Sequence, residues 1–224
     1  MPGTGSDEMF VRAVFARPLA AFGVSLVTPP MPKAGELARG YLTLLDTIAG
    51  ERGEPILVGG ISFGAHLAAE WAVRNPGRCA GLLAALPAWN GVPGSAPASL
   101  AAKLSADLVA RNGLEPALAA SVDGVPGWLS NELSRAWRRH GDGLADSLRE
   151  AAGRRAPTLA ELGAVGVPAG IATCTDDPIH PTKVAYAWAS ALPKSALQET
   201  TLTAMGVDRE SLGRATVLAW LRAS

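Results

Sequence analysis

The stretch that most constrains the fold is residues 55–72, an apolar run that passes through a Gly-x-Ser-x-Gly motif centred on Ser62 into an alanine-rich segment. Residues 56–58 favour a buried strand, and residues 65–72 favour a helix. Glycines two residues either side of Ser62 allow the strand and the helix to approach closely around a sharp, strained turn. We therefore predict a strand, a turn and a helix, with Ser62 raised on the turn as a candidate nucleophile.

Length and charge restrict the class of protein. The 224 residues can bury one substantial core, so we predict a single α/β domain over residues 1–224. Twenty basic and 20 acidic residues cancel, which leaves no global field to attract nucleic acid or anionic lipid. No segment of the chain is typical of a leader or a membrane span, and we expect a cytoplasmic protein that acts on a small molecule. Its oligomeric state is left open.

The two cysteines, Cys79 and Cys174, each lie beside an apolar run. Their separation fits neither a metal-ligand spacing nor a disulfide framework. We predict that both are small buried hydrophobic residues, and we expect no metal and no cofactor.

Apolar runs alternate with helix-like segments, which indicates a mainly parallel sheet with helices on both faces. The predicted strands lie at 23–28, 56–59, 81–86, 167–174 and 196–202. The pattern of residues 88–164 is helical only, and this segment is predicted to be an inserted helical cap. The predicted helices lie at 36–49, 97–111, 127–140, 142–152, 181–192 and 208–221.

Together these features resemble the α/β hydrolase superfamily over nearly the whole chain. The segment around Ser62 resembles the family's nucleophile elbow. The loop 173–181 follows an apolar strand and resembles the loop that carries the acid of a catalytic triad. Asp177 matches the acid best, because Pro178 favours an extended conformation at the preceding residue. Its neighbour Asp176 is an alternative, and a role for both aspartates in shaping the turn stays open.

The resemblance also implies an oxyanion hole. Residues 2–7 are similar to the family loop that lends one backbone N–H, here from Thr4 or Gly5. The second N–H would come from Phe63, the residue after the nucleophile.

Two features depart from the family pattern. Val207 stands where the family has its catalytic histidine after the last strand, and it also suits a hydrophobic staple at the start of the last helix. The family's central strand before the oxyanion loop is missing, unless residues 9–15 or another segment fills its place. Without that strand, the loop would lack the rigid support that an oxyanion hole requires.

A serine hydroxyl needs an adjacent base, so each of the three histidines is a candidate. His180 is the leading one, because it lies three residues after Asp177 in the same loop. His66 lies one helical turn beyond Ser62, where a side chain more often packs beneath the site. His140 ends a predicted cap helix, where a cation is favoured by the helix dipole.

The cap would encode substrate choice, and its tryptophans suggest an apolar substrate. Trp89 follows a strand end, and lining the pocket and packing in the core are both open for it. The first functional hypothesis is a serine hydrolase for a small or medium apolar ester or thioester, impaired by the replacement of histidine by Val207. The second is a hydrolase-fold ligand-binding protein that has lost its chemistry. The third is a cofactor-free lyase or cyclase in which Ser62 polarises a carbonyl.

Overall fold

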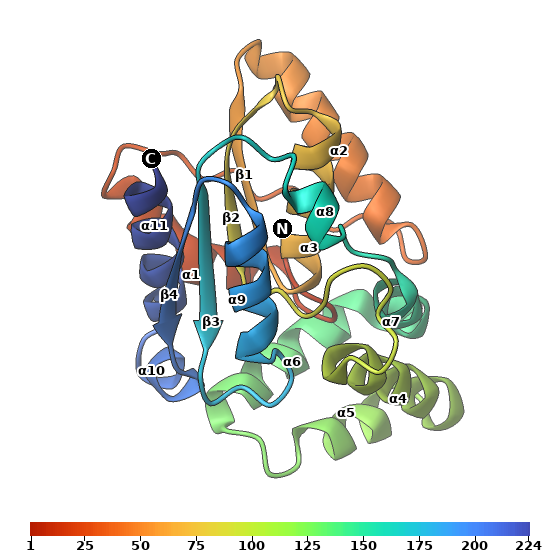
Figure 1. The fold of residues 1–224 in the computed structure, drawn as a ribbon. Helices are drawn as coiled ribbons and strands as arrows, with labels where there is room; N and C mark the ends of the chain where they lie inside the picture. Colours follow the sequence, from red (N-terminus) through yellow and green to blue (C-terminus); the bar gives the residue numbers. More distant parts are fainter.

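A computed structural model describes residues 1–224. Its centre is a four-stranded parallel sheet, drawn as arrows in Figure 1. The strands follow one another across the sheet in the order β1 (Ile56–Ile61), β2 (Cys79–Ala85), β3 (Ala169–Cys174) and β4 (Ser195–Thr200). Parallel neighbours need crossover connections, and a helix or several helices supply each of them. The sheet is parallel throughout, and the class is α/β as predicted.

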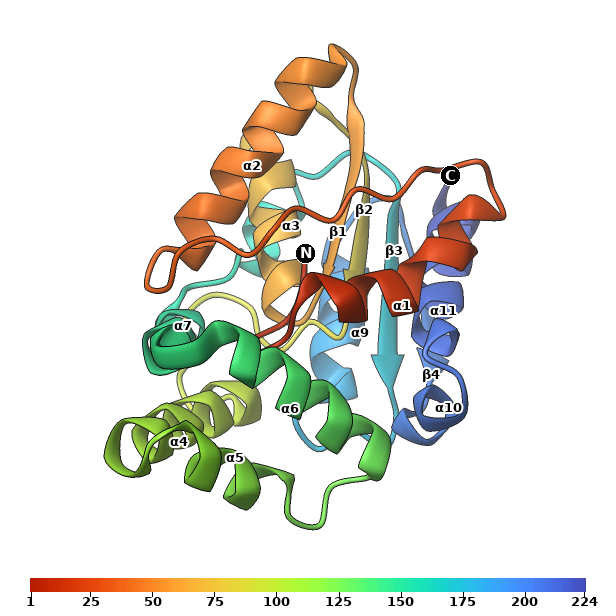
Figure 2. The same ribbon diagram turned by 180° about the vertical axis from the view of Figure 1, so that it is seen from behind.

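Helices cover both faces of the sheet, as Figures 1 and 2 show from opposite sides. On one face α3 (Phe63–Arg74) contacts β1 and β2, while α9 (Thr182–Ala191) contacts β3 and β4. Two further helices extend this layer, α2 (Leu37–Arg52) against α3 and the short α8 (Leu159–Leu162) against α9. The opposite face is covered by α11 (Glu210–Ala223), against which α1 (Glu8–Ala20) packs.

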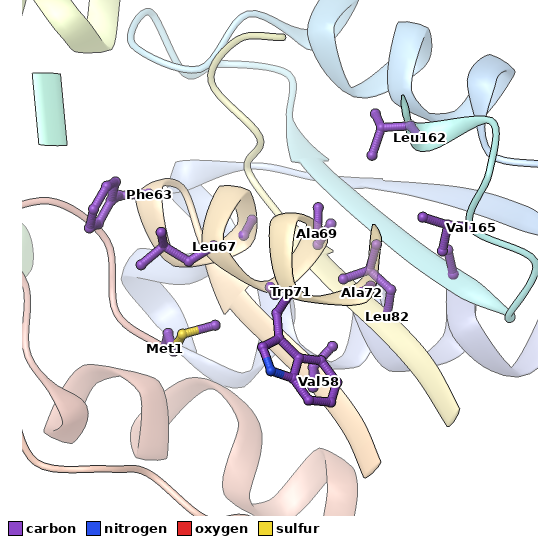
Figure 3. Close-up of a cluster of buried hydrophobic side chains, with 14 of the residues drawn as sticks. Met1, Val58, Phe63, Leu67, Ala69, Trp71, Ala72, Leu82, Leu162 and Val165 are labelled. Carbon is purple, nitrogen blue, oxygen red and sulfur yellow. The ribbon is translucent and has the colours of Figure 1, made fainter. Parts of the chain in front are cut away.

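The larger core cluster lies between α3 and the sheet. Figure 3 shows Phe63, Leu67 and Trp71 of α3 together with Val58 of β1 and the side chain of Met1. These side chains are nearly inaccessible to solvent, and burying one large apolar side chain contributes roughly 1.5–3 kcal/mol. The helix after Ser62 is therefore held firmly against the sheet.

The segment between β2 and β3 contains α4 (Pro97–Asn112), α5 (Leu114–Val122), α6 (Gly127–His140) and α7 (Leu144–Gly153) before α8. The first four lie beyond the carboxyl ends of the strands (Figure 1). They share a separate apolar cluster that includes Leu118, Trp137, Leu144 and Leu148. This is the region in which the sequence predicts a cap, although α5 and α8 are not among the predicted helices.

The prediction of a strand at 23–28 is wrong. These residues follow α1 without regular structure, and the sheet ends at β1. A groove of about 380 Å³ lies between them and β1, and side chains of α1 and α2 also line it. A strand requires a hydrogen-bonded neighbour, so an apolar alternating segment without one stays irregular.

The suggestion that residues 9–15 take the place of the family's central strand is wrong, because they belong to α1. Only Met1 pairs with the free edge of β1. Its amino group donates to the Gly59 carbonyl at 2.7 Å, and its carbonyl accepts from Ile61 N–H at 3.1 Å. Burial lowers the pKa of this amino group to about 5.

The C-terminal region differs from the single predicted helix at 208–221. A separate helix α10 (Leu202–Val207) precedes α11. The side chain of Val207 is exposed, at 88% of its full accessibility, whereas Leu212 is fully buried. The expected hydrophobic staple between Val207 and Leu212 is therefore wrong, because a staple requires the two side chains to pack together.

Candidate active site

Ser62 lies on a sharp turn between β1 and α3. Its φ of 54° and ψ of −115° are uncommon for a residue with a side chain. The turn is so tight that both flanking positions must be glycine. A Cβ on Gly60 would overlap the backbone of Gly64, and one on Gly64 would overlap the Met1 carbonyl. A hydrogen bond from Ser62 N–H to the Ala85 carbonyl, at 2.8 Å, fixes the turn to the end of β2.

The structure brings Ser62, His180 and Asp177 together. His180 Nε2 lies 2.9 Å from Ser62 Oγ, and His180 Nδ1 lies 2.7 Å from Asp177 Oδ2. The imidazole thus spans the serine hydroxyl and the carboxylate. In this arrangement the ring can accept the hydroxyl proton while the carboxylate fixes the ring orientation and its tautomer. The histidine and the acid come from one loop after β3.

The second oxygen of Asp177 folds that loop. Asp177 Oδ1 accepts from Ile179 N–H at 2.8 Å and from His180 N–H at 3.1 Å. Burial opposes ionisation of the carboxyl group, but its hydrogen bonds to the ring and backbone of His180 and its other partners outweigh this effect and lower its pKa. Asp177 is therefore an ionised partner for the imidazole.

Asp176 has a different environment from its neighbour. Its carboxylate accepts from Leu202 N–H and from the N–H and hydroxyl of Thr203 at the start of α10. It therefore stabilises the start of α10. Of the two adjacent aspartates, only Asp177 contacts His180.

The other two histidines are placed away from the Ser62 hydroxyl. His66 is buried, and its Nε2 accepts from the backbone N–H groups of Ala88 and Trp89 at 3.0 and 3.4 Å. Burial, aided by the charge of His180, lowers the pKa of His66 to about 3. His140 ends α6, and its Nε2 lies 3.2 Å from the Ser6 carbonyl. Burial lowers its pKa, so it is not the exposed helix-end cation that the sequence suggests.

The loop expected to form the oxyanion hole lies beside Ser62. A Cβ placed on Gly3 would be 3.3 Å from Ser62 Cβ, so the loop backbone directly adjoins Ser62. Thr4 and Gly5 form the middle of a turn closed by a 3.1 Å hydrogen bond from Ser6 N–H to the Gly3 carbonyl. Phe63, the other expected donor, is the first residue of α3.

Trp89 is packed rather than open to solvent. It forms a small cluster with Ala88 and Ala156, and its ring meets that of His66 edge-on at 4.5 Å between centroids. Both cysteines are free and buried, as predicted. No cluster of three or more metal-binding side chains occurs in residues 1–224, and no helix is both long and apolar enough to span a membrane.

Sequence reasoning misses two residues close to this site. Asp7 is fully buried, and its carboxylate forms two hydrogen bonds with Arg135 of α6. The signal at Asp7 is its position just before an amphipathic segment, which is typical of a helix N-cap. Nothing local marks Arg135, because its partner is 128 residues away.

Comparison of the whole chain with protein-family models gives no match, and none of the curated proteins matches its sequence. Comparison of the fold gives several solved structures. The enol-lactonase from Burkholderia xenovorans LB400 has a TM-score of 0.68 at 17% identity, over 98% of this chain and 88% of that one. MenH from S. aureus has a TM-score of 0.70 at 16% identity, over 99% and 91%.

A thermophilic esterase from Thermogutta terrifontis is also similar, with a TM-score of 0.61 at 19% identity over 89% of this chain and 79% of that one. At such identities the likeness concerns the fold. The four parallel strands, the helices on both faces and these matches define an α/β hydrolase fold, which the sequence motifs predict.

Proposed function

We propose that this protein is a serine hydrolase that cleaves a small or medium apolar carboxylic ester or thioester through an acyl-enzyme on Ser62. The observation that carries the proposal is the position of His180, with Nε2 2.9 Å from Ser62 Oγ and Nδ1 2.7 Å from Asp177 Oδ2. A serine hydroxyl becomes an effective nucleophile when an oriented imidazole removes its proton. The valine at 207 does not impair this chemistry, because the base comes from another loop.

In the first half-reaction His180 Nε2 accepts the hydroxyl proton while Ser62 Oγ bonds to the substrate carbonyl carbon. The Phe63 N–H and a backbone N–H of the Gly3–Ser6 loop donate to the oxyanion. The tetrahedral intermediate then breaks its bond to the alcohol or thiol, which takes the proton from His180. In the second half-reaction His180 removes a proton from water, which attacks the acyl group and releases a carboxylic acid and free Ser62.

The substrate class rests on the surroundings of the site. The cap beyond the strand ends forms its own apolar cluster, which includes Trp137. An esterase and an enol-lactonase are among the solved structures of similar fold, which favours a carboxylic ester bond over other substrates.

The test is hydrolysis of p-nitrophenyl acetate and butyrate by the wild-type chain and by Ser62→Ala, His180→Ala and Asp177→Asn. We expect kcat to fall by about 10³-fold or more in the first two variants and by about 10²-fold or more in the third. Asp176→Asn is the matched control, because it changes the adjacent carboxylate, which contacts α10 instead of His180. Its kcat should stay within about twofold of wild type.

Labelling adds a readout that does not depend on the choice of ester. A fluorophosphonate should modify Ser62 in the wild-type chain, and mass spectrometry of peptides would locate the adduct. Labelling should be absent in Ser62→Ala and slow in His180→Ala. Turnover that survives loss of His180 would contradict the proposal. Ligand-induced stabilisation with neither turnover nor labelling would indicate a binding protein instead.

A further inference from the structure

One group of polar contacts between the cap and the rest of the molecule falls on residues 5–8, beside Ser62, separate from those that Glu150 and Arg154 make with α2 and α3. Arg135 of α6 donates from Nε to Asp7 Oδ2 at 2.9 Å and from a terminal nitrogen to Asp7 Oδ1 at 2.7 Å. One turn further along the same helix, Arg139 forms an ion pair with Glu8. Helix α6 thus holds two successive acidic residues that follow the loop beside Ser62.

Burying the carboxylate of Asp7 at this point costs free energy. Its side chain is 0% exposed, and an unpaired carboxylate in such surroundings would be strongly destabilising. Both oxygens are hydrogen-bonded: besides its bond from Arg135, Oδ1 accepts from Met9 N–H and Phe10 N–H, which caps the start of α1. Burial opposes its ionisation, but the hydrogen bonds from Arg135 and Phe10 outweigh burial and lower its pKa. The carboxylate therefore joins α1 and α6 at a single point.

Two uncharged contacts extend this attachment to the loop itself. A Cβ placed on Gly5 would lie 2.9 Å from the indole nitrogen of Trp137, so the α6 side chain rests directly on the loop backbone. His140 Nε2 lies within hydrogen-bond distance of the Ser6 carbonyl. The opposite end of α6 is anchored as well, because Trp128 packs on Gly206 and stacks with Arg209 at 4.3 Å.

The loop has other contacts, but few are hydrogen bonds. Gly3 packs against Ser62, Met1 pairs with β1 just before the loop, and the turn is closed by one backbone hydrogen bond from Ser6 to Gly3. Hydrogen-bond donors stabilise an oxyanion only when they are held in place before the reaction. The contacts from α6 fall on the four residues that follow Gly3 and Thr4. Figure 2 shows α6 running beneath the N-terminal segment and α1.

We propose that Asp7 and Arg135 are positioning residues for catalysis: their ion pair uses cap helix α6 to hold the Gly3–Ser6 backbone beside Ser62. The inference rests on the proposed function, since it assigns the loop to the oxyanion. It also makes the cap part of the catalytic apparatus as well as a cover for the substrate. A cap that moves away from the core would withdraw the support of the oxyanion donor.

The test compares Arg135→Met and Asp7→Asn with Arg138→Met. Arg138 is a matched control, because it lies on the same helix and forms an equally bidentate pair with Glu115 at 2.8 Å, entirely within the cap. We expect Arg135→Met to lower kcat by about 10–100-fold with KM changed by less than about threefold. The affinity for a boronic acid, whose tetrahedral adduct carries the oxyanion charge, should fall by a similar factor. Arg135→Lys should restore part of both, and Arg138→Met should change neither.

Hydrogen exchange supplies a readout that does not require turnover. In Arg135→Met the amides of residues 4–6 should exchange at least about tenfold faster than in the wild-type chain, while the amides of β2 and β3 keep their protection and show that the protein remains folded. Unchanged exchange of residues 4–6 in folded Arg135→Met would overturn the positioning role. If the loop loosens but kcat and boronate affinity stay at wild-type values, the link to the oxyanion is wrong. Absence of Ser62-dependent turnover in the wild-type chain would instead refute the proposed function, and exchange would still decide whether the pair holds the loop.

Discussion

His66 is expected to make the protein sensitive to mild acid, although its hydrogen bonds are with backbone N–H groups and not with the Ser62 hydroxyl. Its Nε2 accepts two backbone N–H groups and must therefore be unprotonated in the folded state. The folded-state pKa is about 3, whereas an unfolded histidine titrates near its ordinary value of 6.5. Between these two values the unfolded chain binds the proton and the folded chain does not, so stability falls as the pH decreases.

The size of the effect follows from the two pKa values. Through this residue alone, the free energy of unfolding should be about 2 kcal/mol lower at about pH 5 than at about pH 7.5. The amino group of Met1 and the imidazole of His140 have lowered pKa values too and act in the same direction. The total acid sensitivity is therefore not specific for His66, and a difference between two proteins is required.

The assay is urea unfolding of the wild-type chain and His66→Gln at several values between about pH 5 and about pH 7.5. Glutamine can accept the same N–H groups through its amide oxygen but does not titrate. The stability advantage of the wild-type chain at neutral pH should shrink by about 2 kcal/mol at the acidic end. Parallel stability curves for the two proteins would refute the reasoning, because they would mean that His66 is protonated equally in both states.

Three further outcomes are expected. Val207→His should leave kcat within about twofold of wild type, because residue 207 is exposed and His180 already contacts Ser62; a large gain in esterase assays would contradict this. Gly60→Ala should destabilise the chain by more than about 3 kcal/mol in urea unfolding, or prevent folding, because a Cβ there overlaps the Gly64 backbone. Thr201→Ala should lower stability by about 1 kcal/mol through loss of the α10 cap, with unchanged kcat.

The sequence predicts the elements that carry local signals. The apolar run before Ser62 and the glycines beside it predict β1, the turn and α3. The signals for these elements lie in their own residues. The helix at 127–140 is predicted at its observed bounds, because Gly127 follows a proline and Gly141 ends the periodic pattern. The prediction of a strand at 23–28 is wrong because strand formation depends on a neighbouring strand, which a local pattern does not reveal.

The candidate site shows the same division. The Asp177-x-x-His180 spacing is local, and the carboxylate folds its own loop by accepting from Ile179 and His180 N–H, so the pair could be proposed from the sequence. The contact between Asp7 and Arg135 joins residues 128 positions apart and depends on how α6 lies on the core. The sequence contains 20 basic residues that could pair with Asp7, and only the packing of the helices determines which of them does.

The proposed base, His180, lies in the same loop as Asp177, and this placement changes which parts of the fold the proposed chemistry depends on. Ser62 follows β1 and His180 follows β3, with β2 between them. Two strand spacings of about 4.8 Å therefore separate the two loops, and the side chains must reach inward over the end of β2. Hydrogen bonds from Ser62 N–H to Ala85 and from Leu86 N–H to Ala172 fix the three strand ends relative to one another. The distance between Ser62 Oγ and His180 Nε2 is thus set by the register of β1, β2 and β3. Helices α10 and α11 are free of the constraint that a histidine after the last strand would impose on them.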